Sequence, residues 1–129
     1  MDRNTKAPKV HRKASSIKTI DMIGLLGDEY SLKILTATQN YFMSIDRMID
    51  ELGIPMISCY RRVRELERHN LLESCYISSP GTKRKRAYQS NLQSYNIQYV
   101  NGGIRTQVRY NNKEEPEFFD IKSNLIYFG

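Results

Sequence analysis

Two groups of closely spaced basic residues are the strongest chemical feature of this sequence. Arg61, Arg64 and Arg68 recur at steps of three and four residues, and four consecutive cations follow at 83–86. An arginine can bind a guanine edge bidentately or clamp a phosphate, and a run of cations is stabilised when it meets an anionic polymer. The chemistry indicated is therefore recognition of a polyanion, and it depends on the elements that hold the two groups.

The arginines lie in a stretch, residues 44–70, that the pattern predicts to be two helices joined by a tight turn. Ser44 suits an N-cap, Gly53 suits a left-handed closing position, and Pro55 suits the first turn of the next helix, where its missing N–H costs nothing. Apolar residues of the first helix recur at i, i+3, i+4 and i+7: Ile45, Met48, Ile49 and Leu52.

The second helix, expected over residues 55–69, has two opposed faces on a helical wheel. Its core face combines Cys59, Val63 and Leu66. The opposite face carries the three arginines and Ile57, with Tyr60 at its edge. This face suits a DNA groove, because an apolar side chain can also meet a thymine methyl. Alternatively, Glu65 pairs with Arg61 and with His69 at i,i+4, as on an ordinary solvated helix.

The next stretch predicts a β-hairpin with a cationic tip. Two short β-prone runs in ESCYISSPGTKRKRAYQS flank a Pro80-Gly81 turn. The cations at 83–86 are expected on the exposed loop, where they repel one another unless an anion meets them. A phosphate backbone is the commonest such partner.

Charge is unevenly distributed along the chain of 129 residues, whose formal net charge is +6. Residues 1–18 hold six Lys or Arg against one Asp, and residues 53–90 hold eight against three acidic residues. Residues 19–52 are acidic, with two cations against six carboxylates, and 91–129 are balanced. One surface facing a polyanion would explain this distribution.

Gly53-Ile54 followed by SCYRRVRELERHNLL resembles the helix, turn, helix and wing entry of winged helix-turn-helix regulators, most closely the ArsR-like type common in archaea. The resemblance covers roughly residues 19–90. It implies an α+β fold with a three-helix core and a hairpin wing, and a transcriptional regulator that binds duplex DNA with the helix at 55–69. This chain departs from the family in having Pro55, Met56 and Ile57 where polar residues usually open that helix. The candidate DNA-binding residues are Ile57, Ser58, Tyr60, Arg61, Arg64, Arg68, Lys83, Arg84, Lys85 and Arg86.

The N-terminal part divides into a basic arm, residues 1–16, and the start of the winged domain, residues 17–92. The arm has little apolar content and is expected to be disordered, either as a solvated tail or as an extension onto DNA. A first helix is expected from Ser16 to Gly27, with isoleucines at three-residue steps. Asp28 then caps a helix whose core residues are Leu32, Ile34 and Leu35, and residues 41–43 suit a short strand against the wing.

The C-terminal part is expected to add a second hairpin, residues 93–112, and an acidic-aromatic tail, residues 113–129. Alternating strands flank Asn101-Gly102-Gly103, and the odd and even residues of 104–110 divide into a charged and an apolar face. ArsR-like proteins often carry a dimerisation helix here. The hairpin could pack on the domain, pair with a second subunit through its edge, or present its arginines to a partner. The tail is too apolar to be solvated, so it docks on its own hairpin or on a second copy, contributing to a homodimer.

Other classes of function find little support. The sequence has no phosphate loop, nucleophile elbow or zinc signature, so neither an enzyme nor a cofactor or metal site is expected. Cys59 and Cys75 lack metal-ligand spacing, including that of ArsR-like metal sensors, and fit a reducing compartment. Without a long apolar run, we expect a soluble cytoplasmic protein associated with the nucleoid and no membrane contact. The alternatives to a regulator are a non-specific nucleoid-type DNA-binding protein and a winged-helix module that contacts proteins.

Overall fold

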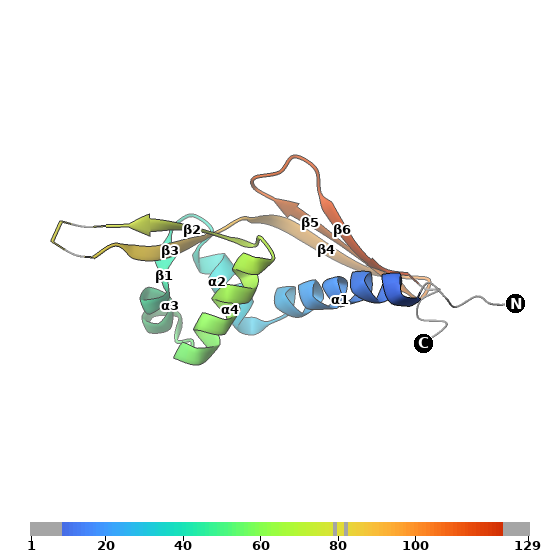
Figure 1. Ribbon diagram of the computed structural model, residues 1–129, viewed down its shortest axis with the longest axis horizontal. Coiled ribbons are helices and arrows are strands. Elements are labelled where there is room, and N and C mark those ends of the chain that lie inside the picture. The colour runs from blue at the N-terminus through green and yellow to red at the C-terminus, as the bar shows by residue number, and fades with distance from the viewer. Residues whose placement is uncertain (1–8, 79, 82, 123–129) are drawn as a thin grey trace, which may run out of the picture.

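The computed structural model describes residues 9–78, 80–81 and 83–122, with side chains described from residue 18 onward. Within this part of the chain, four helices and two antiparallel three-stranded sheets form an elongated molecule (Figure 1). The helices are α1 (Lys9–Leu26), α2 (Glu29–Ala37), α3 (Ile45–Leu52) and α4 (Met56–Arg68). The strands are β1 (Met43–Ser44), β2 (Leu72–Ile77), β3 (Lys85–Ser90), β4 (Leu92–Val100), β5 (Gly103–Tyr110) and β6 (Glu117–Ile121).

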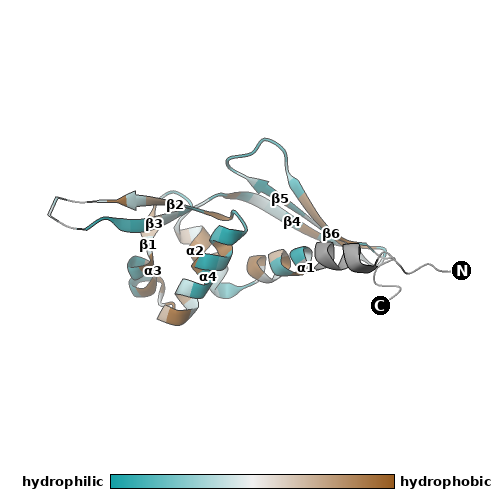
Figure 2. Ribbon diagram, viewed as in Figure 1, coloured by the Kyte–Doolittle hydropathy of each residue, from teal (hydrophilic) through white to brown (hydrophobic). Residues whose placement is uncertain are grey.

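The first half of the molecule packs α2, α3 and α4 beside a sheet of order β1-β3-β2. The hairpin of β2 and β3, with the loop between them (residues 72–90), is called the wing; it projects away from the helices at one end of the molecule (Figure 1). Figure 2 shows apolar and polar residues alternating along α2 and α4, as expected for helices with one packed face. The buried core of this half includes Ile34, Leu35, Met48, Ile54, Cys59, Val63, Leu66, Leu71 and Leu72.

Local backbone chemistry fixes both ends of the α3–α4 pair. The Ser44 hydroxyl accepts a hydrogen bond from the Arg47 N–H at 3.3 Å, and Gly53 closes α3 with a φ of 68°. Pro55 is the N-cap of α4. At the other end Asn70 adopts a left-handed conformation, with a φ of 64°, and the Leu71 N–H donates to the Leu66 carbonyl at 2.9 Å. This Schellman-type ending turns the chain directly from α4 into the wing.

The second half consists of α1 and a sheet of order β4-β5-β6, and α1 packs against β6. The Thr19 hydroxyl donates to the Asp120 carbonyl at 3.3 Å, and the Tyr95 hydroxyl donates to the Leu26 carbonyl at 3.3 Å. The β4–β5 turn has two residues with positive φ, Asn101 at 51° and Gly102 at 78°, which is the tight turn that matches strand twist.

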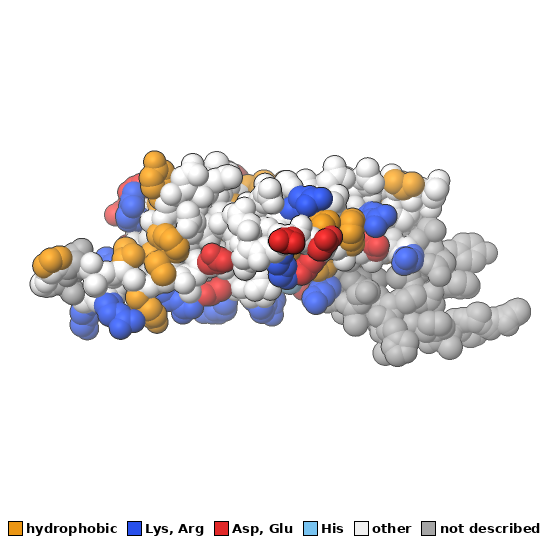
Figure 3. Space-filling view, turned by 90° about the horizontal axis from the view of Figure 1, so that it is seen from above, with side chains coloured by type: hydrophobic (Ala, Val, Ile, Leu, Met, Phe, Trp, Pro, Cys, Tyr) orange, Lys and Arg blue, Asp and Glu red, His pale blue; other side chains and the backbone are white. Residues whose placement is uncertain are grey.

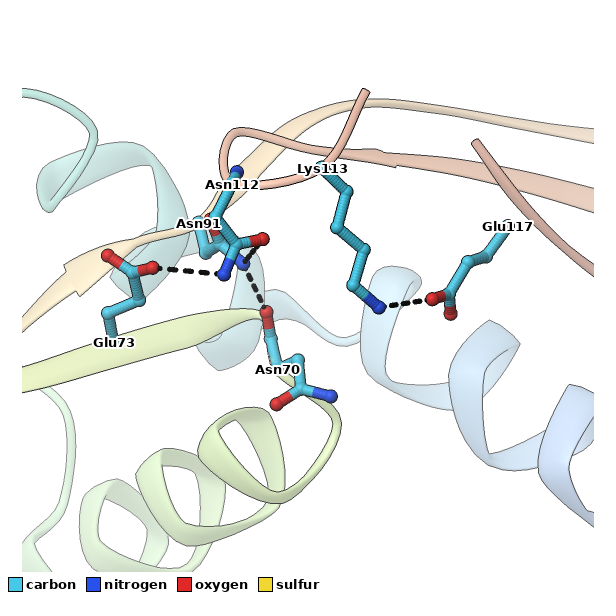
Figure 4. A network of polar contacts seen from close by, with 6 residues as sticks. All are labelled: Asn70, Glu73, Asn91, Asn112, Lys113 and Glu117. Carbon is cyan, nitrogen blue, oxygen red and sulfur yellow. Dashed lines mark hydrogen bonds and ion pairs between the residues drawn. The ribbon is translucent and has the colours of Figure 1, made fainter. Parts of the chain in front are cut away.

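A buried asparagine joins the two sheets. Asn91, only 2% exposed, lies between β3 and β4, and its amide donates to the Asn70 carbonyl at 2.9 Å and to the Asn112 side chain at 3.0 Å (Figure 4). The Asn112 amide in turn donates to Glu73 on β2, at 3.3 Å. These bonds connect the end of α4, the wing and the second sheet, and they join the two halves in addition to the continuous apolar core, which holds Leu66 and Tyr110 in one cluster.

Most predicted elements are confirmed. The helices after Asp28, Ser44 and Pro55 form, and so do both hairpins. The short strand expected over residues 41–43 is shifted, because β1 comprises Met43 and Ser44 and leaves out Tyr41 and Phe42. The core residues Cys59, Val63 and Leu66 are buried. Residues 117–121 of the predicted tail pair with β5, so this part docks on its own hairpin; residues 123–129 lie outside the described residues.

The expectations for the N-terminal segment need correction. The first helix begins at Lys9 rather than at Ser16, so residues 9–16 belong to α1 and not to a disordered arm; residues 1–8 lie outside the described residues. Alanine, lysine and arginine have high helix propensity, which lets a helix extend without an apolar stripe. The packed face of α1 is also different, because Ile20 is 57% exposed whereas Thr19 and Met22 are buried.

Candidate nucleic-acid interface

The outer side of α4 presents the predicted ridge to solvent. This α4 ridge, defined as Ile57, Tyr60, Arg61, Arg64 and Arg68, is exposed at every position. Ser58, the remaining candidate on this helix, is half-buried. Ile57 is 72% exposed, and Met56 beside it is 60% exposed. The ridge is held outward because the opposite side of α4 is fixed by the buried core.

The arginines of α4 divide into two kinds. The guanidinium of Arg62 makes two hydrogen bonds to the Asp28 carboxylate, at 2.8 and 3.0 Å, and lies over the Tyr30 ring at 5.9 Å. The Arg62 hydrogen bond lowers the pKa of Asp28 to about 2, so this pair is ionised and clamps α4 to the start of α2. Arg62 is therefore part of the scaffold.

Arg61 and Arg64 have no such partner. Within the described residues, no carboxylate lies in ion-pair distance of either guanidinium. Glu65, considered above as a partner of Arg61 and His69, instead accepts from Arg68 at 2.6 Å. The i,i+4 pairs of an ordinary solvated helix are thus absent at Arg61, and its charge is available to an external anion.

The wing cations occupy two different settings, which corrects the expectation that all four lie on the loop. Lys83 and Arg84 precede β3, and the Arg84 guanidinium lies over the Tyr76 ring at 4.4 Å. Lys85 and Arg86 are the first two residues of β3. The hairpin register places Arg86 opposite Tyr76 and Lys85 opposite Ile77, so both cations belong to the paired strands and not to the turn.

The two strand cations are bound to carboxylates of the helices. Lys85 pairs with Asp46 of α3 at 3.3 Å, and Arg86 pairs with Glu67 of α4 at 2.7 Å and donates to the Ser74 hydroxyl at 3.2 Å. All of these groups are partly exposed. The loop end of the paired strands is therefore tied to α3 and α4. Only Lys83 and Arg84 combine exposure with the absence of a carboxylate partner among the described wing residues.

The α4 ridge and the wing cations lie on adjoining surfaces. Tyr60 of the ridge and Lys85 and Arg86 of the wing line one shallow hollow, together with Ile45 and Asp46. In Figure 3, Lys and Arg side chains gather along one long edge of the molecule, from the wing past the helices. The sequence pattern could not reveal three further members of this region, Tyr76, Asp46 and Glu67, since their contacts join segments far apart in the chain.

Other kinds of site are not found in the described part of the chain. There, no group of three or more His, Cys, Asp or Glu side chains could hold a metal ion, and no helix is long and apolar enough to cross a membrane. Cys59 is fully buried, and its burial raises the pKa of the thiol. A packing role for Cys59 follows.

Comparison with known proteins gives limited information. Neither a family model nor a curated protein matches the chain. Among solved structures, the chain is similar to NolR from Sinorhizobium fredii, with 15% sequence identity and a TM-score of 0.48. The match covers 68% of this chain and 81% of NolR. A likeness this slight supports no inference on its own, so fold and function rest on the arrangement of elements described above.

Proposed function

We propose that this protein binds double-stranded DNA as a winged helix-turn-helix regulator of the ArsR-like type. In this proposal α4 enters the major groove and the wing lies along the backbone or in the adjacent minor groove. The observation that carries the proposal is the exposure of Arg61 and Arg64, without a carboxylate partner among the described residues, beside a cationic wing. A regulator of this kind acts in the cytoplasm, on the nucleoid.

The dimensions and rigidity of α4 support a role in the groove. Its 13 residues span roughly 20 Å at about 1.5 Å per residue, and the major groove, about 12 Å wide, admits a helix. The Asp28–Arg62 clamp holds the middle of the helix, and the Schellman-type ending at Asn70 fixes its C-terminal end. A helix held in this way enters a groove without a large loss of conformational entropy.

Different residues are proposed for base recognition and for backbone contact. Arg61 and Arg64 would reach guanine edges, and Ile57 would meet a thymine methyl, with Ser58 and Tyr60 beside them. Arg68 forms an ion pair with Glu65, and it would bind a DNA phosphate by exchanging this carboxylate for the phosphate. Lys83 and Arg84 would contact phosphates directly, whereas Lys85 and Arg86 would contribute from the start of β3.

A non-specific nucleoid-type protein is the second candidate. The specific observation in its favour is the first turn of α4, where Met56 and Ile57 are exposed in place of polar base-reading groups. Apolar side chains of this kind also insert between base steps in architectural proteins.

Selection of bound fragments from a random duplex pool, followed by salt titration, tests the proposal. We expect discrimination of about a thousandfold or more between selected and random DNA. Replacing Arg61 or Arg64 by alanine should cost about 1–3 kcal/mol on the selected site and little on random DNA. Arg109→Ala, which removes one exposed cation from β5, is the matched control and should leave binding unchanged.

The wing is tested by the double substitution K83A/R84A. If these side chains bind phosphates, affinity falls on all sequences alike, and the slope of log affinity against log salt becomes shallower by about 0.9 for each phosphate that is no longer neutralised. Equal affinity of the wild type for selected and random DNA would favour the nucleoid-type protein. Absence of binding to any DNA at low salt would refute both and leave a module that contacts proteins.

A second copy of the chain is the other partner we propose, joined through the C-terminal hairpin. Strand β6, from the predicted tail, pairs with β5 of its own copy and occupies that edge of the sheet. The edge that remains for a second copy is therefore β4.

A further inference from the structure

Strand β4 forms an open edge of the second sheet. It pairs with β5 on one side, and the sheet order β4-β5-β6 shows no strand on its other side among the described residues. Every residue from Gln93 to Val100 is exposed. An edge strand of this length offers a row of unpaired backbone N–H and C=O groups to another strand.

The edge lacks the usual protection against pairing. No charged residue and no proline occurs between Ala87 and Ile104. The register shift between Leu92 and Ser94 is confined to the start of the strand. The opposite edge, β6, is different: it is shorter, it carries Glu117 and Asp120, and α1 packs against it. Natural edges are guarded by charges, prolines or covering helices. The absence of all three at β4, within the part of the chain that the structure describes, indicates that this edge has a partner.

The sequence of β4 is self-complementary. Residues 95–99 read Tyr-Asn-Ile-Gln-Tyr, which has the same order of side-chain types in both directions about Ile97. Tyr95, Ile97 and Tyr99 share the face of Val108 and Thr106, and they are 40%, 41% and 75% exposed. An antiparallel contact across a two-fold axis places identical surfaces against each other, and such a sequence satisfies both sides at once.

We infer that two copies of this chain pair through β4 in antiparallel orientation, with the two-fold axis at Ile97. Each Ile97 then faces Ile97 of the second copy, each Tyr95 faces a Tyr99, and each Asn96 faces a Gln98. Aromatic and β-branched pairs directly opposite each other stabilise antiparallel sheets. The contact joins two three-stranded sheets into one sheet of six strands without bringing any charged side chain of this net-cationic protein into the pairing.

The pairing leaves the proposed DNA surface open. β4 belongs to the half of the molecule away from the wing tip (Figure 1). A symmetric dimer of this kind presents two copies of α4 and therefore suits an inverted repeat, a consequence that rests on the proposed function. The dimer specifies the second-copy contact that is part of the proposed function, but it does not depend on DNA binding, because it is measured without DNA.

Analytical ultracentrifugation of the full chain, from about 1 μM to about 500 μM, tests the inference. The wild type should pass from monomer to dimer within this range. Ile97→Lys should raise the dissociation constant at least about tenfold, because two ammonium groups would face each other across the axis. Tyr41→Lys, which changes an exposed tyrosine in the other half, should dimerise like the wild type. Circular dichroism verifies that each variant is folded.

Disulfide trapping tests the register independently of any loss of folding. In a Cys75→Ser background, Ile97→Cys should form an intermolecular disulfide, since residues directly opposite have Cβ atoms about 5 Å apart. Tyr99→Cys should not, because its equivalent in the second copy lies about four residues along the strand, about 13 Å away. A wild type that stays monomeric, an Ile97→Lys variant that dimerises normally, or equal trapping at both positions would overturn the inference.

Discussion

The two halves of this molecule expose surface in opposite ways. The half built from α2, α3, α4 and the wing exposes cations. Carboxylates of its helices and of the segment before α2 pair with Arg62, Lys85 and Arg86, whereas Arg61 and Arg64 meet no carboxylate among the described residues. The half built from α1 and the β4–β6 sheet exposes an uncharged strand with unpaired backbone groups. This difference matches the two partners that we propose, a polyanion for the first half and another strand for the second. The exposed cations and the strand edge with unpaired backbone groups thus lie in different halves of the elongated molecule.

Substitution of Asn91 tests whether the two halves are coupled, and we expect it to cause the largest loss of stability among these predictions. Asn91→Ala removes the bonds to the Asn70 carbonyl and to Asn112 and leaves buried groups unpaired, so we expect a loss of about 3 kcal/mol in the free energy of unfolding. Urea denaturation measures it, with the exposed Asn40→Ala, outside both the network and β4, as the control. Two separate transitions in the variant would show that the halves unfold independently, whereas an unchanged midpoint would mean that the network contributes no stability.

The Asp28–Arg62 clamp of the cationic half should give a pH-dependent effect of about 2 kcal/mol. The pKa of Asp28 falls from its ordinary value of 3.8 to about 2 in the fold, so the stabilisation is complete above pH about 4 and is lost as the pH falls toward 2. Asp28→Asn should therefore be less stable than the wild type at pH 7 and similar to it near pH 2. Denaturation across this range measures the difference. Glu29→Gln, at the exposed neighbour, should follow the wild type, and a parallel pH profile for Asp28→Asn would contradict the clamp.

In the half built from α1 and the β4–β6 sheet, a substitution of Thr106 should raise the free energy of unfolding, by a smaller amount than the losses above. Its hydroxyl is fully buried in β5, without a hydrogen-bond partner among the described residues. Thr106→Val keeps the shape and removes the desolvated hydroxyl, so the free energy of unfolding should rise by about 1 kcal/mol. A shift of the thermal midpoint to higher temperature measures this gain. A lower midpoint would mean that a bound water satisfies the hydroxyl.

The smallest effect is expected at Glu67, which compensates Arg86 at the start of β3. Glu67→Gln should cost about 0.5 kcal/mol of stability, as for a partly exposed ion pair. DNA binding should become slightly tighter, since a carboxylate near the phosphates is removed while Arg86 remains. Fluorescence anisotropy at low salt measures it, and Glu115→Gln, at an exposed carboxylate between β5 and β6, provides a charge-matched control. Weaker binding would instead assign Glu67 the role of positioning Arg86.

Much of the architecture can be predicted from short sequence patterns that mark the ends of helices. Ser44, Gly53 and Asp28 mark helix ends because their side chains or their conformational freedom act within a few residues. The start of α1 at Lys9 was not predicted, since helix propensity without an apolar stripe gives only a weak signal. The left-handed Asn70 was also missed, although asparagine before two leucines is a recognisable helix ending.

The sequence by itself determined periodicity, caps and the total of exposed charge, because each of these depends on neighbours along the chain. Only the tertiary structure decided which cations are compensated. Arg62 meets Asp28 across 34 residues, and Lys85 meets Asp46 across 39, whereas Arg61 and Arg64 meet no described carboxylate. It also decided that β4 lies at an edge. Electrostatic pairing and strand pairing both depend on distances in space, and packing and register set those distances.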